Sequence, residues 1–86
     1  MSVAIDYDII TIGGKDYCFE RGTLFTEGFH EYYGIYTDKD GVLQKSTWKK
    51  INGSWYYFDR NGFMLTGWQT IGGKQYLFRG DGSLFE

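Results

Sequence analysis

Residues 51–68 read INGSWYYFDRNGFMLTGW, and about 20 residues later the chain repeats this pattern as IGGKQYLFRGDGSLF at residues 71–85. A third copy, IGGKDYCFERGTLFTEGF, occupies residues 12–29, and a degraded copy, YGIYTDKDGVLQKSTW, occupies residues 33–48. The junctions between copies fall at Phe29, Trp48 and Trp68. A fixed period of this length is typical of repeat proteins, in which each copy is one supersecondary unit.

Each copy predicts a β-hairpin. A two-residue turn, such as Asn52-Gly53 or Gly72-Gly73, separates a short strand from an aromatic strand. Such pairs favour the tight turns of hairpins, because both residues tolerate a positive φ. A unit of about 20 residues cannot bury its own apolar face, whereas stacked units share one. The sequence therefore predicts an all-β fold, a β-solenoid of four stacked β-hairpins.

The predicted solenoid forms one continuous domain with five segments. We expect an N-terminal capping strand at 1–9, repeat 1 at 10–29, a degraded repeat 2 at 30–48, repeat 3 at 49–68 and a truncated repeat 4 at 69–86. Because solenoids need capped ends, the end at repeat 4 predicts either pairing with another copy or continuation into a longer parent protein.

Composition excludes several classes. The 86 residues include 13 Gly, no Pro and 21% aromatic side chains, which suits short strands and tight turns better than a helical bundle. The net charge is −2, whereas proteins that bind nucleic acid carry an excess of basic residues on the binding surface. Apolar runs are too short to span a membrane. The first 12 residues lack the basic region of a secretory signal, so a cytoplasmic chain and a processed piece of a larger protein both stay open.

Catalytic and metal sites are not predicted. Cys18 is the single cysteine, so a cysteine zinc site cannot form. His30 is the single histidine, and the sequence shows no Ser/His/Asp set that includes it. We interpret Cys18 as a buried free thiol. Acidic residues lie at turn positions, where bonding of the side chain to the backbone explains them; they are Asp38, Asp40, Asp59 and Asp81. We therefore expect no enzyme activity, no metal and no cofactor.

The two faces of the aromatic strand differ. Tyr56 and Phe58 share one face, and the same Tyr/Phe pair recurs at equivalent positions in repeats 1 and 4, which indicates a stacking role. The other face carries Trp55 and varies between copies. Trp55 is either part of the core at a junction or a ligand platform.

A ligand-binding cage is predicted at the junction of repeats 2 and 3. Trp48 and Trp55 lie on either side of the Asn52-Gly53 turn, and Tyr76 of the next repeat could supply a third ring. Rings at right angles suit a quaternary ammonium, and flat rings also suit a sugar face. A weaker second cleft would use Phe29, Tyr33 and Tyr56.

Residues 48–68 resemble the cell-wall-binding repeat of choline-binding proteins, and residues 66–78 are similar to the short repeats of large clostridial toxins and glucan-binding proteins. The resemblance implies a left-handed β-solenoid that binds choline on teichoic acids, or surface glycans, without catalysis. It implies that Trp48, Trp55 and Tyr76 hold the ligand and that Met64 lines the floor. Gln75 and Asp16 replace the platform aromatic in the last and first repeats, so one complete cage is expected.

Two functions remain open from the sequence. The first is a binding module for choline or a glycan, which would be extracellular or associated with the cell wall. The second is a protein-interaction or oligomerisation solenoid that has lost small-ligand binding, with self-association through the solenoid ends.

Overall fold

The computed structural model describes residues 7–31 and 33–86. Over this part of the chain the regular secondary structure consists of strands, without any helix. They are β1 (Tyr7–Ile12), β2 (Lys15–Glu20), β3 (Thr23–Leu24), β4 (Gly28–His30), β5 (Ile35–Thr37), β6 (Thr47–Ile51), β7 (Ser54–Phe58), β8 (Gly67–Ile71) and β9 (Lys74–Phe78). The described residues accordingly hold no helix that could cross a membrane. The prediction of an all-β chain is confirmed.

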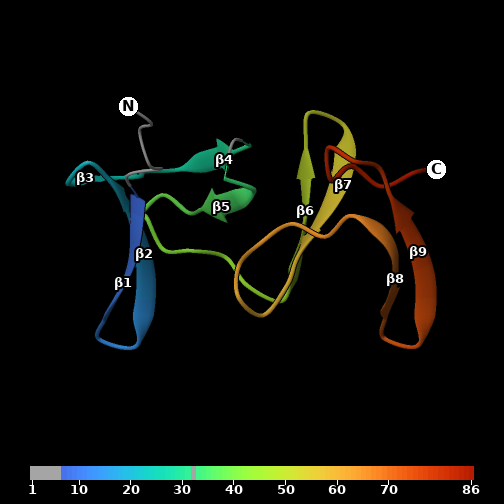
Figure 1. The fold of residues 1–86 in the computed structure, drawn as a ribbon, viewed down its shortest axis with the longest axis horizontal. Coiled ribbons are helices and arrows are strands. Elements are labelled where there is room, and N and C mark those ends of the chain that lie inside the picture. Colours follow the sequence, from blue (N-terminus) through green and yellow to red (C-terminus); the bar gives the residue numbers. More distant parts are fainter. Residues whose placement is uncertain (1–6, 32) are drawn as a thin grey trace, which may run out of the picture.

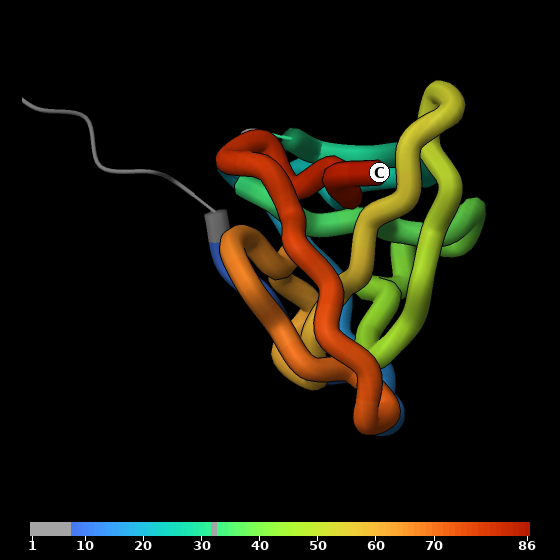
Figure 2. The backbone as a smooth tube through the Cα atoms, turned by 90° about the vertical axis from the view of Figure 1, so that its right-hand side faces the viewer, coloured from blue at the N-terminus to red at the C-terminus, as the bar shows by residue number. Residues whose placement is uncertain are grey.

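The strands form four separate antiparallel sheets, each built on one hairpin. They are β1–β2 with the short β3 added, β4–β5, β6–β7 and β8–β9. In Figure 1 these hairpins follow one another from left to right in chain order. Figure 2 shows that they project in different directions, with the turn of β6–β7 at the top and the turn of β8–β9 at the bottom. Residues 1–6 of the expected capping strand lie outside the described residues, and residues 7–9 belong to β1.

The predicted two-residue turns are present at three hairpins. Asn52 and Gly53 have φ angles of 50° and 85°, and Gly72 and Gly73 have φ angles of 60° and 82°. Two successive positive φ values define the type I′ turn, whose twist matches that of the flanking strands. The turn fixes the register, so that Ile51 pairs with Ser54 and Trp48 pairs with Tyr57.

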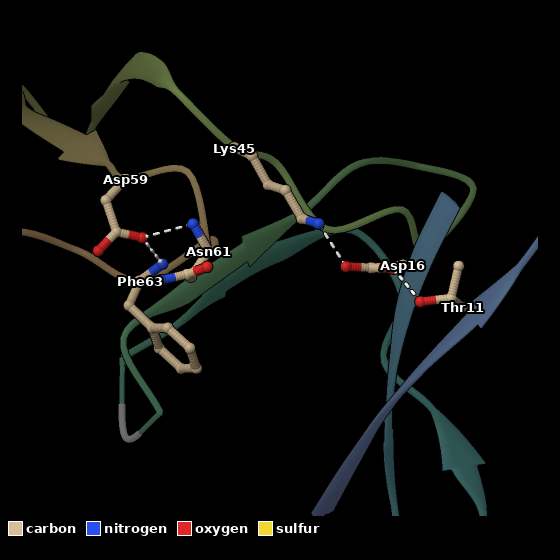
Figure 3. Close-up of polar contacts among 6 residues, drawn as sticks. All are labelled: Thr11, Asp16, Lys45, Asp59, Asn61 and Phe63. Atoms are coloured by element: carbon tan, nitrogen blue, oxygen red, sulfur yellow. Dashed lines mark hydrogen bonds and ion pairs between the residues drawn. The ribbon is translucent and has the colours of Figure 1, made fainter. Parts of the chain in front are cut away.

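Aspartates close the second turn of the repeats, as the sequence predicts. The Asp59 carboxylate accepts backbone N–H groups of Asn61 and Phe63 at 2.9 and 3.0 Å (Figure 3). Asp38 accepts the equivalent N–H groups of Asp40 and Val42, both at 2.9 Å. These local bonds satisfy turn amides that no strand partner reaches.

Backbone hydrogen bonds join each repeat to the one before it. Three loop residues at equivalent positions, Leu43, Met64 and Leu84, donate their N–H groups to carbonyl oxygens of the preceding hairpin. The acceptors are Asp16, Gly34 and Trp55, at 2.8, 2.8 and 2.7 Å. Recurrence of this bond with the sequence period places Asp16, Gly34 and Trp55 at the same position of three successive units.

The core lies where the hairpins meet. Phe58 and Phe78 are buried, which agrees with the stacking role predicted for their face. In the first hairpin the fully buried residue is Cys18, on the opposite face of β2 from Phe19, because Cys18 packs with Ile35 and Leu43 of the next unit. Cys18 is a free buried thiol, as predicted, and burial raises its pKa.

The degraded repeat replaces an aromatic core residue with a polar cluster. Thr37 occupies the position of Phe58 and is fully buried. Its hydroxyl donates to the carbonyl oxygen of Thr26 at 2.5 Å, and the His30 Nε2 group donates to Thr37 Oγ1 at 2.9 Å. The imidazole also stacks on Phe25 at 4.1 Å between ring centroids. A neutral His30 completes this cluster with Nε2 protonated.

Stability should therefore fall as His30 becomes charged. Burial holds the His30 pKa below its ordinary value of 6.5, outweighing the opposing effects of the Thr26 carbonyl and of Glu20. As the pH falls, His30 therefore takes up a proton in the unfolded chain before it does so in the folded chain. The free energy of unfolding declines as the pH falls below about 6.5, and it levels off below the pKa of His30 in the folded chain. Urea denaturation between about pH 5 and pH 8 measures this decline. His30→Gln should flatten it, and an unchanged slope in this variant would contradict the assignment.

Candidate functional site

Two tryptophans project from one face of the third hairpin. Trp48 lies on β6 and Trp55 on β7, and the β6–β7 register pairs Trp48 with Tyr57 and Lys50 with Trp55. Alternation of side chains therefore puts both indoles on the same side of this sheet. Their ring centroids lie 6.3 Å apart and the ring planes meet at 84°. The two indoles thus form two walls at right angles.

The fourth hairpin supplies the third ring. Tyr76 lies on β9, and its ring centroid is 4.9 Å from that of Trp48 with an interplanar angle of 68°. Phe78, two residues further along β9, is buried, and its ring centroid lies 5.8 Å from that of Trp48. The structure therefore brings together the three aromatic residues that the sequence places in one cage.

These rings line an open cavity of ≈ 330 Å³. It is lined by Trp48, Trp55, Tyr76 and Leu84. Trp55 remains 37% exposed, so one indole wall faces solvent while Trp48 is half-buried. A cavity walled by electron-rich rings at steep angles can hold a compact organic cation against several ring faces at once.

The floor of this cavity differs from the prediction, because its lining contains Leu84 where the resemblance implies Met64. Leu84 stands one repeat after Met64, and its N–H group bonds to the Trp55 carbonyl at 2.7 Å. That bond draws the loop of the fourth unit beneath the rings of the third. Met64 makes the same bond one unit earlier, to Gly34, and its side chain lies beside Gly34 and Gly82.

The second predicted group is split between two places. Phe29 and Tyr56 lie together, with ring centroids 4.9 Å apart at an angle of 49°. Tyr33 instead packs near Phe25, at 5.6 Å, and donates its hydroxyl proton to Glu20 at 2.8 Å. This junction lacks the platform ring, because Gly34 stands where the next unit has Trp55.

At the first junction an ion pair stands in place of a ring. Asp16 occupies the Trp55 position, and its carboxylate accepts hydrogen bonds from the Lys45 ammonium and from the Thr11 hydroxyl (Figure 3). These two bonds hold the pKa of Asp16 below its usual range. The equivalent position is thus Asp16 at the first junction, Gly34 at the second and Trp55 at the third. The aromatic cavity lies at the third junction, which has the tryptophan. No cluster of potential metal ligands occurs within residues 7–31 and 33–86.

Family models match both units that build the cavity. A model described as choline-binding repeat matches residues 45–68, and one described as cell wall binding repeat matches residues 66–84. Residues 45–84 are thus matched by models of choline-binding and cell wall binding repeats. The two models meet at residues 66–68, so the four residues that line the cavity come from both matched segments. No curated protein matches the chain.

Solved structures of choline-binding proteins share the fold of nearly the whole chain. Choline binding protein F from Streptococcus pneumoniae, solved with a peptidoglycan analogue, is 29% identical over 91% of this chain, with a TM-score of 0.76. The Cpl-1 endolysin, also complexed with a peptidoglycan analogue, is 25% identical over 94% of this chain, with a TM-score of 0.82. The chain spans about a quarter of either protein, 27% and 25% respectively.

A third structure shows the same fold at lower identity. The pneumococcal cell wall endolysin from phage Cp-1, solved with choline, is 23% identical over 93% of this chain, and the chain covers 25% of that protein with a TM-score of 0.79. The fold of this chain is thus shared by choline binding protein F and by cell wall endolysins. The repeats are binding modules in which the sequence predicts no catalytic residues.

Proposed function

We propose that this chain is a non-enzymatic module that binds a quaternary ammonium group, such as the choline of a cell-wall polymer, in the cavity between β6–β7 and β8–β9. The observation that carries the proposal is the set of ring angles around the cavity, 84° between Trp48 and Trp55 and 68° between Trp48 and Tyr76. A cation inside meets several π-faces, each contributing about 0.5–2 kcal/mol.

The lining favours a cation over a sugar. A glycan stacks on a broad flat ring and needs polar side chains for its hydroxyl groups, whereas this cavity is walled by steeply crossed rings and by Leu84. Glycans remain the alternative ligand, and the titration below separates the two. Structural relatives have been solved with choline and with a peptidoglycan analogue, and this supports a ligand from the cell wall.

The proposal includes the architecture of the module. The four hairpins form a short β-solenoid with repeats at 10–29, 30–48, 49–68 and 69–86, and the recurring bonds from Leu43, Met64 and Leu84 support this stacking. Such a module acts at the cell surface, as the cell wall binding repeats suggest. Binding at a single complete cage would be weak, so other sites in a longer protein would add avidity.

A titration with choline tests the proposal. Because Trp48 and Trp55 line the cavity, choline should change the tryptophan fluorescence with a saturable, one-site curve. Tetramethylammonium, which has the cation without the hydroxyl group, should compete. A flat response to choline, together with a saturable response to galactosides or glucans, would move the function to glycan binding. No response to either ligand class would remove the proposal.

A further inference from the structure

Successive hairpins of this chain are joined by three kinds of contact, each of which recurs with the sequence period. The first is the backbone bond from the loop N–H groups of Leu43, Met64 and Leu84 to a carbonyl oxygen of the preceding hairpin. The second is the close approach of a loop glycine to a side chain of the preceding loop. The third joins a ring of one hairpin to the Tyr/Phe pair of the next. Each contact has two unlike halves, so the two faces of a hairpin differ.

The glycine contact is close at all three junctions. A Cβ atom built at Gly41, Gly62 or Gly82 would lie 3.1, 2.6 or 2.5 Å from the loop side chain of the preceding hairpin. Gly22 is the equivalent glycine of the first hairpin, two residues before Leu24, with a φ of 81°. Its turn is one residue shorter than the others, and none of the residues that the structure describes lies within 4 Å of a Cβ atom built there. Gly22 therefore leaves room for the loop side chain of another hairpin.

The ring contact shows the same difference between inner and outer hairpins. At the second and third junctions a ring of one hairpin lies 4.9 Å from the tyrosine ring and 6.0 or 5.8 Å from the phenylalanine ring of the next, between centroids. These phenylalanines, Phe58 and Phe78, are buried. Phe19 of the first hairpin is only half-buried, and Trp68 of the fourth remains 68% exposed. Each of the two outer hairpins thus has one half of a contact that the inner junctions complete.

The outer hairpins lie at opposite ends of the molecule (Figure 1) and carry opposite halves of the same three contacts. The C-terminal end face presents an acceptor carbonyl, a loop side chain and a junction ring, which belong to Gln75, Leu84 and Trp68. The N-terminal end face presents the matching loop N–H group, the open glycine and the Tyr/Phe pair, which belong to Leu24, Gly22, Tyr17 and Phe19. A hairpin of the same kind therefore fits either face.

From this complementarity we infer that copies of this chain associate head to tail, with the N-terminal end face of one copy on the C-terminal end face of the next. Two like faces do not match, since each would bring an acceptor carbonyl to a carbonyl or an open glycine to a glycine. A contact between unlike faces propagates into a row of copies unless its rotation closes a ring. The inference goes beyond the proposed function and does not depend on the ligand.

Sedimentation equilibrium of the whole chain, from micromolar to millimolar concentration, tests the inference. The average mass should rise with concentration and pass twice the mass of one chain. Gly22→Ala should abolish this rise, because its methyl group would meet the Leu84 side chain of the next copy, as a Cβ atom at Gly62 would meet Leu43. Gly53→Ala is the matched control. Gly53 belongs to the third hairpin, has a similar φ of 85° and has nothing within 4 Å of a Cβ atom, so this variant should associate as the parent does.

A mixing experiment tests the direction of the contact. Trp68→Ala removes the ring from the C-terminal end face and should weaken association by about tenfold or more. A mixture of Gly22→Ala and Trp68→Ala contains one intact face of each kind, so its mass should rise to that of a heterodimer and stop there. A parent chain that stays monomeric at every concentration would overturn the inference and leave the end faces to repeats of a longer protein. A dimer that Gly22→Ala leaves unchanged would also overturn it, because like faces would then pair.

Discussion

Replacing Trp55 with alanine should weaken binding of choline by about thirtyfold or more while leaving the fold intact. The change removes one of the two indole walls that meet at 84°, and with it one ring face for the cation. Loss of such a contact corresponds to roughly 2 kcal/mol. The alanine keeps the backbone carbonyl that accepts the Leu84 N–H group, so the loop beneath the cavity stays attached.

The stability cost of this change should be small. Trp55 is 37% exposed, so its truncation sacrifices less buried area than the removal of a core aromatic residue, which costs about 3–5 kcal/mol. Isothermal calorimetry measures the affinity, and urea denaturation of the same sample measures the free energy of unfolding. Trp48 remains in the cavity, so fluorescence still reports any residual binding.

Trp68→Ala provides the matched control for Trp55→Ala. Trp68 stands at the position of Trp48 in the next repeat, is 68% exposed and does not line the cavity. Its removal deletes an indole without touching the proposed site, so choline affinity should stay within about twofold of the parent, as expected for a surface substitution. Equal losses in both variants, or parental affinity in Trp55→Ala, would contradict the assignment of the cavity as the binding site.

Much of the fold can be predicted from local sequence signals. The pairs Asn52-Gly53 and Gly72-Gly73 adopt the expected positive φ angles, and they set the strand register that follows. The degraded repeat could not be predicted in the same way. Thr37 replaces a core aromatic residue there, and it is accommodated by bonds to Thr26 and His30, which lie 11 and 7 residues away in the chain. Such a cluster leaves no periodic pattern.

Two features of the sequence predict the site in part. They are the strand register within each hairpin and the order of the repeats. Trp48 and Trp55 share a face because of the Asn52-Gly53 turn, and the repeat order brings Tyr76 next to them. The floor depends on how two hairpins are offset, which the bond from Leu84 to Trp55 decides. The signal that could have identified Leu84 is the period itself, since it stands 20 residues after Met64.

Gly62→Ala should destabilise the chain by about 3 kcal/mol. Gly62 has a φ of 92°, and a Cβ atom built there would lie 2.6 and 2.8 Å from two carbon atoms of Leu43. The backbone conformation costs an alanine about 1–2 kcal/mol, and overpacking against a core side chain adds about 1–3 kcal/mol. Leu43 is buried in the cluster with Cys18 and Ile35, so it has little room to move away. Urea denaturation measures the loss.

Gly53→Ala separates the two contributions, because Gly53 has a similar φ of 85° and nothing within 4 Å of the position of a Cβ atom. It should cost only the backbone term, about 1–2 kcal/mol. In a Leu43→Ala background, where the clashing carbon atoms are gone, Gly62→Ala should cost no more than Gly53→Ala does. Equal costs for the two glycines in the parent chain would mean that the loop of repeat 3 does not pack on Leu43. The contact between successive loops would then not be the constraint that holds neighbouring hairpins, and with them the cavity, in register.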